Sequence, residues 1–75
     1  MESFNNVINN YEEAIQIFKS DPELKIFTNY VKMSEFCHQF TPKLIKELEN
    51  YTEEEKRIIQ QKDEQLRQVA KSYHH

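Results

Sequence analysis

Cys37 and His38 form the one Cys/His neighbour pair in the chain, and both residue types serve in nucleophilic catalysis and zinc binding. A nucleophilic pair must face each other and needs a third, orienting group. Neighbours in a helix point about 100° apart. A zinc site needs four ligands at recognisable spacing, which these residues and His74-His75 do not provide. We expect no metal site and no cofactor, with Cys37 a small buried hydrophobe and His38 at the core edge.

Carboxylates cluster at Glu12-Glu13 and at Glu53-Glu54-Glu55. Acid–base catalysis needs a pocket that shifts a pKa, whereas these acids lie on predicted helix surfaces or helix starts, where they suit the helix dipole. The chain has no glycine, so phosphate-binding loops of the familiar kinds are absent. We therefore predict a protein without catalytic residues, not an enzyme. The pair His74-His75 is either native or the remnant of a tag, and no function is argued from it.

The composition predicts an all-α protein, a small helical bundle of one domain over residues 1–75. A β-rich fold would need glycine in its turns, and this chain of 75 residues has none. A single cysteine fits a reducing compartment. The sequence contains neither an apolar run of about 20 residues nor a recognisable signal peptide. We expect a cytoplasmic protein with no membrane partner.

The charge balance argues against nucleic acid as a partner. The net charge is −3; residues 1–40 carry six acids and three bases, and residues 41–75 carry seven of each. Phosphate contacts dominate nucleic-acid affinity and usually require a basic face. A nucleic-acid-binding regulator is therefore the less favoured class, and no small-molecule substrate is predicted.

The first helix is predicted over residues 3–19. Its apolar residues fall within an arc of roughly 120° on a helical wheel, as in a helix with one buried face. The members of this arc are Phe4, Val7, Ile8, Tyr11, Ala14, Ile15 and Phe18. Ile17 lies outside it.

The second helix is predicted over residues 22–40, with Asp21 as its cap, Pro22 at its first position and Thr41-Pro42 at its end. Its apolar arc is roughly 200° wide, about twice what one buried face needs. We therefore expect this helix to be covered on two sides. The arc comprises Leu24, Ile26, Phe27, Tyr30, Val31, Met33, Ser34, Cys37, His38 and Phe40.

Phe36 falls in the polar arc of the second helix. With Ile17, it would form an exposed aromatic and aliphatic anchor for a binding partner. The alternative is that the third helix covers Phe36.

The third helix is predicted over residues 42–73. Apolar steps of three and four residues indicate a heptad seam that keeps its phase through residues 50–53, which favours one long helix. The alternative is a break at 50–52, because Thr52-Glu53-Glu54-Glu55 has the pattern of a capping box. The bundle is then a helical hairpin plus a long third helix, kinked or broken.

A continuous third helix would extend past the hairpin by about 12–15 residues, leaving its apolar stripe without an internal partner. We predict that this stripe binds another protein or a second copy. Two charged seam residues fit either an antiparallel dimer, in which Glu55 of one chain meets Lys62 of the other, or side chains that simply reach water. The predicted partner-binding residues are Ile17, Phe36, Glu55, Ile59, Lys62, Leu66, Val69 and Tyr73.

These features predict a small, non-enzymatic protein-interaction module, acting as a regulator, adaptor or inhibitor of another protein through helical surfaces. The alternative is a structural homo- or hetero-oligomeric helical subunit of a larger assembly.

Overall fold

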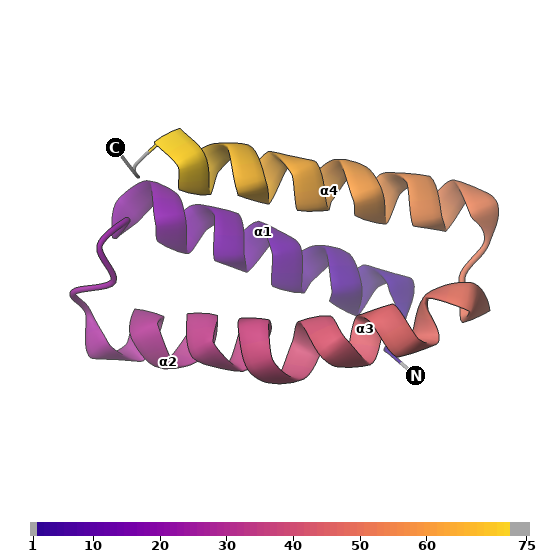
Figure 1. The fold of residues 1–75 in the computed structure, drawn as a ribbon, viewed down its shortest axis with the longest axis horizontal. Coiled ribbons are helices and arrows are strands. Elements are labelled where there is room, and N and C mark those ends of the chain that lie inside the picture. Colours follow the sequence, from indigo (N-terminus) through magenta and orange to yellow (C-terminus); the bar gives the residue numbers. More distant parts are fainter. Residues whose placement is uncertain (1, 73–75) are drawn as a thin grey trace.

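A computed structural model describes residues 2–72, in which three helical rods lie along one another (Figure 1). The first and last rods run in the same direction and the middle one runs opposite to them. Within residues 2–72 there is no strand, which confirms the all-α prediction. The first rod is α1 (Phe4–Ser20), and the third is α4 (Glu53–Ser72). The second rod consists of four consecutive segments: α2 (Phe27–Glu35), a π-helical segment (Phe36–Phe40), α3 (Thr41–Glu47) and a 3-10 turn (Leu48–Asn50).

Helix α1 is the centre of the packing, because α4 and α2 both pack against it. Val7 is fully buried, and Ile17, which the sequence pattern placed off the apolar stripe, is also buried. The helix covered on two sides is therefore α1, and the expectation that the second helix has this position is wrong. The core consists of Val7, Tyr11, Ala14, Ile15, Ile17, Met33, Phe36, Leu44, Tyr51, Ile59 and Leu66.

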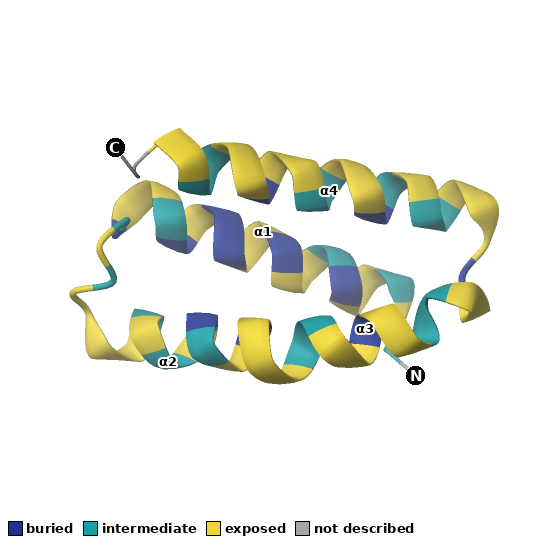
Figure 2. Cartoon of the chain, viewed as in Figure 1, coloured by how far each residue is buried: buried dark blue, intermediate teal, exposed yellow. Residues whose placement is uncertain are grey.

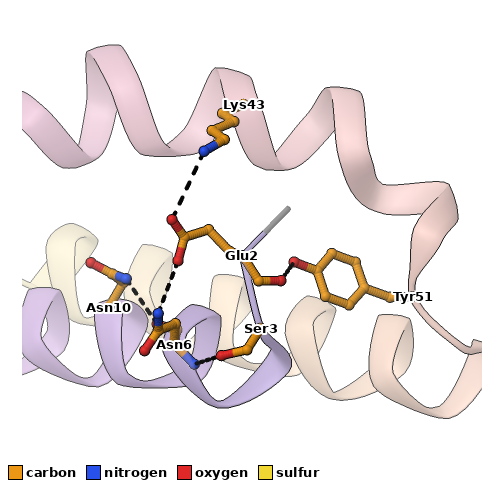
Figure 3. A network of polar contacts seen from close by, with 6 residues as sticks. All are labelled: Glu2, Ser3, Asn6, Asn10, Lys43 and Tyr51. Carbon is orange, nitrogen blue, oxygen red and sulfur yellow. Dashed lines mark hydrogen bonds and ion pairs between the residues drawn. The ribbon is translucent and has the colours of Figure 1, made fainter.

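The segment before α1 is attached to the second rod by polar contacts (Figure 3). The Ser3 hydroxyl caps α1 by accepting from the Asn6 N–H at 3.2 Å. The carbonyl of Glu2 accepts from the Tyr51 hydroxyl, and its carboxylate lies 3.9 Å from the Lys43 ammonium. The Ser3 contact caps α1 itself, and the Tyr51 contact joins the start of α1 to the turn after α3.

Asp21 organises a loop, and the prediction that it caps a helix beginning at Pro22 is wrong. Its carboxylate accepts from the backbone N–H groups of Lys25 and Ile26, both at 2.9 Å, and these bonds hold the pKa of this carboxyl below its usual value. Leu24 closes a turn onto the Asp21 carbonyl with a positive φ of 53°, which interrupts helical geometry. Helix α2 therefore begins only at Phe27.

Pro42 lies inside the second rod, so the prediction that Thr41-Pro42 ends the helix is also wrong. Proline cannot donate a backbone hydrogen bond, and its ring crowds the carbonyl four residues earlier. The helix widens to π geometry just before it: the Thr41 N–H and hydroxyl both reach the Phe36 carbonyl, the hydroxyl at 2.8 Å. This wider turn accommodates Pro42 without ending the rod.

The chain breaks between the second and third rods at Tyr51-Thr52, so the favoured prediction of one continuous third helix is wrong and its alternative is right. The Thr52 hydroxyl accepts from the Glu55 N–H at 3.1 Å, and the Glu55 carboxylate accepts from the Thr52 N–H at 3.0 Å. This reciprocal pair is the capping box that the sequence indicated. The break turns α4 back along α1, where its apolar stripe is covered.

No helix within residues 2–72 combines the length and the apolar character that crossing a membrane requires.

Candidate functional site

Within residues 2–72, four large apolar side chains are exposed, and all belong to the second rod or to the residue just before it. The exposed fractions are 55% for Ile26, 76% for Phe27, 56% for Tyr30 and 68% for Ile45. Large exposed apolar residues that gather on one element are typical of interaction surfaces. We call these four residues the apolar flank.

Helical spacing places the members of the apolar flank on α2 close together. At about 100° per residue, Ile26, Phe27, Tyr30 and the exposed Cys37 fall within an arc of roughly 100°. Ile45 continues the flank after the π-helical segment. The distance along the rod from Phe27 to Ile45 is about 27 Å at 1.5 Å per residue.

The apolar flank is exposed because α1 covers a different side of the rod. Met33, Phe36 and Phe40, spaced by three and four residues, turn toward α1, where the Phe36 ring lies 5.3 Å from the Tyr11 ring, edge to face. The Phe36 and Phe40 rings lie 5.0 Å apart. Figure 2 shows the consequence along the second rod, whose buried segments face α1 and whose side away from α1 is largely exposed.

A groove of about 490 Å³ lies between α3 and α4 and joins the apolar flank at Ile45. Its apolar lining includes Leu44, Leu48 and Ile59, all buried or partly buried. The groove is bordered by three basic side chains of α4, those of Lys56, Arg57 and Arg67. The groove is therefore an apolar depression with a charged margin, suited to a side chain of a protein partner.

Tyr11 crosses from α1 to the α4 wall of this groove. Its hydroxyl donates to the Asp63 carboxylate at 3.1 Å, and the other oxygen of that carboxylate accepts from Arg67 Nε at 2.7 Å. Burial, followed by the charge and hydrogen bond of Asp63, raises the pKa of Tyr11 well above its ordinary value. A phenol that is hard to ionise does not serve as a base near neutral pH, so this contact positions α1 against α4.

The raised pKa of Tyr11 predicts a loss of stability at alkaline pH. The unfolded tyrosine ionises near pH 10 and the folded one only above that, so the contribution is complete below about pH 10 and falls as the pH rises. The free energy of unfolding should decrease by up to about 1.4 kcal/mol per pH unit from this group. Urea titrations at several pH values should show a shallower decrease for Tyr11→Phe than for the wild type. Tyr30→Phe, at an exposed tyrosine, is the control and should decrease as steeply as the wild type. An equal slope for Tyr11→Phe and the wild type would contradict the assignment of this effect to Tyr11.

A second groove, of about 300 Å³, lies between α1 and α2 on another part of the surface. Its margins carry Glu13 and Lys32, whose charged groups lie 3.9 Å apart. An exposed pair at this distance contributes little, and the groove lacks a cluster of exposed apolar side chains. We therefore regard it as the weaker candidate.

Most of the predicted partner-binding residues lie away from the exposed surface. Ile17, Phe36, Ile59 and Leu66 are buried in the core, and Val69 is partly buried against it. The prediction that Phe36 and Ile17 are exposed is wrong, because α1 packs against both α2 and α4. The predicted alternative, with Phe36 covered by the third helix, also fails in part, since the aromatic cover comes from Tyr11 of α1.

The two charged residues of the predicted seam have partners within the chain. Glu55 completes the capping box of α4, and the Lys62 ammonium lies 3.3 Å from a carboxylate oxygen of Glu12. The pairing of Glu55 with Lys62 between two copies stays a prediction. Neither side chain carries an unpaired charge that would favour such a pair. Tyr73 lies outside the described residues.

Sequence reasoning did not single out the four exposed residues of the apolar flank. For Ile26, Phe27 and Tyr30 the signal was present in the 200° apolar arc, which is wider than one covering helix can bury, whereas Ile45 lay in the predicted third helix. Periodicity measures how wide the apolar side is, but it does not say which part another element will cover.

Cys37 and His38 are exposed, so the prediction that Cys37 is a buried hydrophobe is wrong. The π-helical segment that contains both residues turns Phe36 and Phe40 inward instead. Among the described residues, no three His, Cys, Asp or Glu side chains come together as a metal would require.

Comparison of the chain with protein-family models, with curated proteins and with solved structures gave no match.

Proposed function

We propose that this protein is a non-enzymatic interaction module, which regulates or connects other proteins by binding through its apolar flank. The observation that carries the proposal is the gathering of Ile26, Phe27, Tyr30 and Ile45, each more than half exposed, along one rod. Leaving such side chains in water forgoes the free energy that their burial would contribute, about 25 cal/mol per Å² of apolar surface. A partner that covers them recovers that free energy.

The neighbouring surface fits this role. Aromatic and aliphatic anchors dominate the binding energy of protein interfaces, and polar residues surround them. Phe27 and Tyr30 supply such anchors, and the groove beside Ile45 offers a depression for a side chain of the partner. The net charge of −3 gives no comparable support to a nucleic-acid partner.

Capture experiments with surface variants test the proposal. Immobilised wild-type protein should retain a stoichiometric partner from nuclease-treated native lysate, whereas Phe27→Glu and Ile45→Glu should retain at least about tenfold less. Thr28→Glu is the matched control, since Thr28 is exposed on the same helix but outside the apolar flank. Equal retention by all four proteins would show that the partner binds elsewhere.

A further inference from the structure

We propose that the apolar flank pairs with the apolar flank of a second copy, in an antiparallel dimer whose two-fold axis passes beside Cys37. This inference rests on the proposed function, because it assumes that the apolar flank is a binding surface. It identifies one occupant of that surface.

The distribution of apolar residues along the rod is self-complementary. In a two-fold contact, residue i of one copy meets residue j of the other and the reverse contact also forms. If Tyr30 of one copy lies opposite Ile45 of the partner subunit, the axis falls between positions 37 and 38. The same register places Phe27 opposite Leu48 of the partner subunit, which is partly buried within its own copy but lines the surface groove, and Ile26 opposite the exposed Glu49 of the partner subunit.

The middle of the proposed contact permits close approach. Ser34, Cys37 and Thr41 lie near the axis in this register and are small and uncharged, and the exposed His38 lies there too, opposite Cys37 of the partner subunit. Two rods can therefore approach at their centres while the larger side chains pack at both ends. Cys37 is exposed, so none of residues 2–72 covers the axis position.

The groove between α3 and α4 provides a place for the most exposed residue of the flank. Leu48 and Ile45 line this groove, and Phe27 of the partner subunit lies beside them in the proposed register. A groove of about 490 Å³ on each copy would receive one phenyl ring from the other. Because the dimer is two-fold symmetric, this contact between Phe27 and the groove of the other copy forms twice.

The area is sufficient for a weak dimer. A large aromatic side chain can bury roughly 150–250 Å², and four side chains that are more than half exposed leave on the order of 500 Å² per copy. Two copies would bury about 1,000 Å², which is the lower end for specific interfaces. We therefore expect a dissociation constant of about 10–100 μM, with monomer and dimer in exchange.

Sedimentation under reducing conditions tests the association. The wild type should change from monomer to dimer between about 1 μM and 1 mM, and Phe27→Glu and Ile45→Glu should each weaken the dimer at least about tenfold. Thr28→Glu should associate like the wild type, and circular dichroism should show that all variants stay helical.

Cross-linking tests the position of the axis. Diamide, a two-electron oxidant, takes two electrons and two protons from a pair of thiols, so Cys37 should form a disulfide with Cys37 of the partner subunit. The control is Cys37→Ser with Glu35→Cys, which moves the single thiol to an exposed position on another side of α2. That variant should form at least about tenfold less disulfide dimer at the same concentration.

The outcomes separate this inference from the proposed function. A monomer at every concentration would overturn the dimer, and partner capture that depends on Phe27 would still support the interaction module. A dimer that persists in both Glu variants, or that cross-links more through position 35 than through Cys37, would overturn the antiparallel arrangement.

Discussion

Leu66→Glu is expected to destabilise the protein strongly, because it places a charge in the contact between α4 and α1. Leu66 is buried with Ile59 in the core cluster, and Val69, on the same α4 stripe, packs against that cluster. Losing the side-chain packing and burying a carboxylate should cost at least about 3–5 kcal/mol. A domain of this length has a total stability on the order of 4–11 kcal/mol. Urea unfolding followed by circular dichroism would measure the loss.

Gln65→Glu is the matched control, since it introduces the same charge at an exposed position one residue earlier. It should change the free energy of unfolding by no more than about 0.5 kcal/mol. A Leu66→Glu protein that stayed as stable as the wild type would show that α4 does not pack along α1. That result would restore the arrangement in which the third helix projects from the bundle.

Phe36→Ala is expected to destabilise the protein by about 3–5 kcal/mol, because it removes a buried ring that makes one of the aromatic contacts between the second rod and α1. The Phe36 ring packs against both Tyr11 and Phe40, at centroid distances of 5.3 Å and 5.0 Å. A cavity at this point would also loosen the π-helical turn before Pro42. Thermal and urea unfolding would both report the change.

Phe27→Ala provides an internal comparison, since it makes the same substitution at the exposed aromatic of the same rod. It should leave the free energy of unfolding within about 0.5 kcal/mol of the wild type. If Phe27→Ala destabilised the protein as much as Phe36→Ala, then Phe27 would be part of the core. The apolar flank would then lose its most exposed residue.

Two similar sequence patterns gave two different structures, which shows where local reasoning stops. Asp21-Pro22 and Thr41-Pro42 both resemble helix starts, yet the first forms a loop and the second lies within a helical rod. The Asp21 carboxylate accepts from backbone N–H groups four and five residues further along, a local arrangement that differs from a helix cap, whereas packing of Leu44 against the core favours continuing the rod. Local helix propensity does not include the packing of Leu44.

The amphipathic pattern of α1 and the capping box at Thr52 were informative because each is local. The amphipathic pattern depends on apolar residues that recur in neighbouring turns of the helix. The capping box depends on Thr52 and Glu55, which are three residues apart. The candidate site was not predictable in the same way. The wide apolar arc of the second helix indicated two covered sides, but only the fold decides that α1 covers Met33 and Phe36 while Phe27 and Tyr30 stay exposed.

The central claim is that the apolar flank is the surface through which this protein associates. Residue-resolved NMR spectra of the labelled protein test it most directly, recorded from about 20 μM to 1 mM and again with the captured partner. We expect the signals that shift to concentrate between positions 26 and 48, on the exposed side of the second rod. Shifts confined to the outer side of α4, with Phe27, Tyr30 and Ile45 unchanged, would contradict the claim.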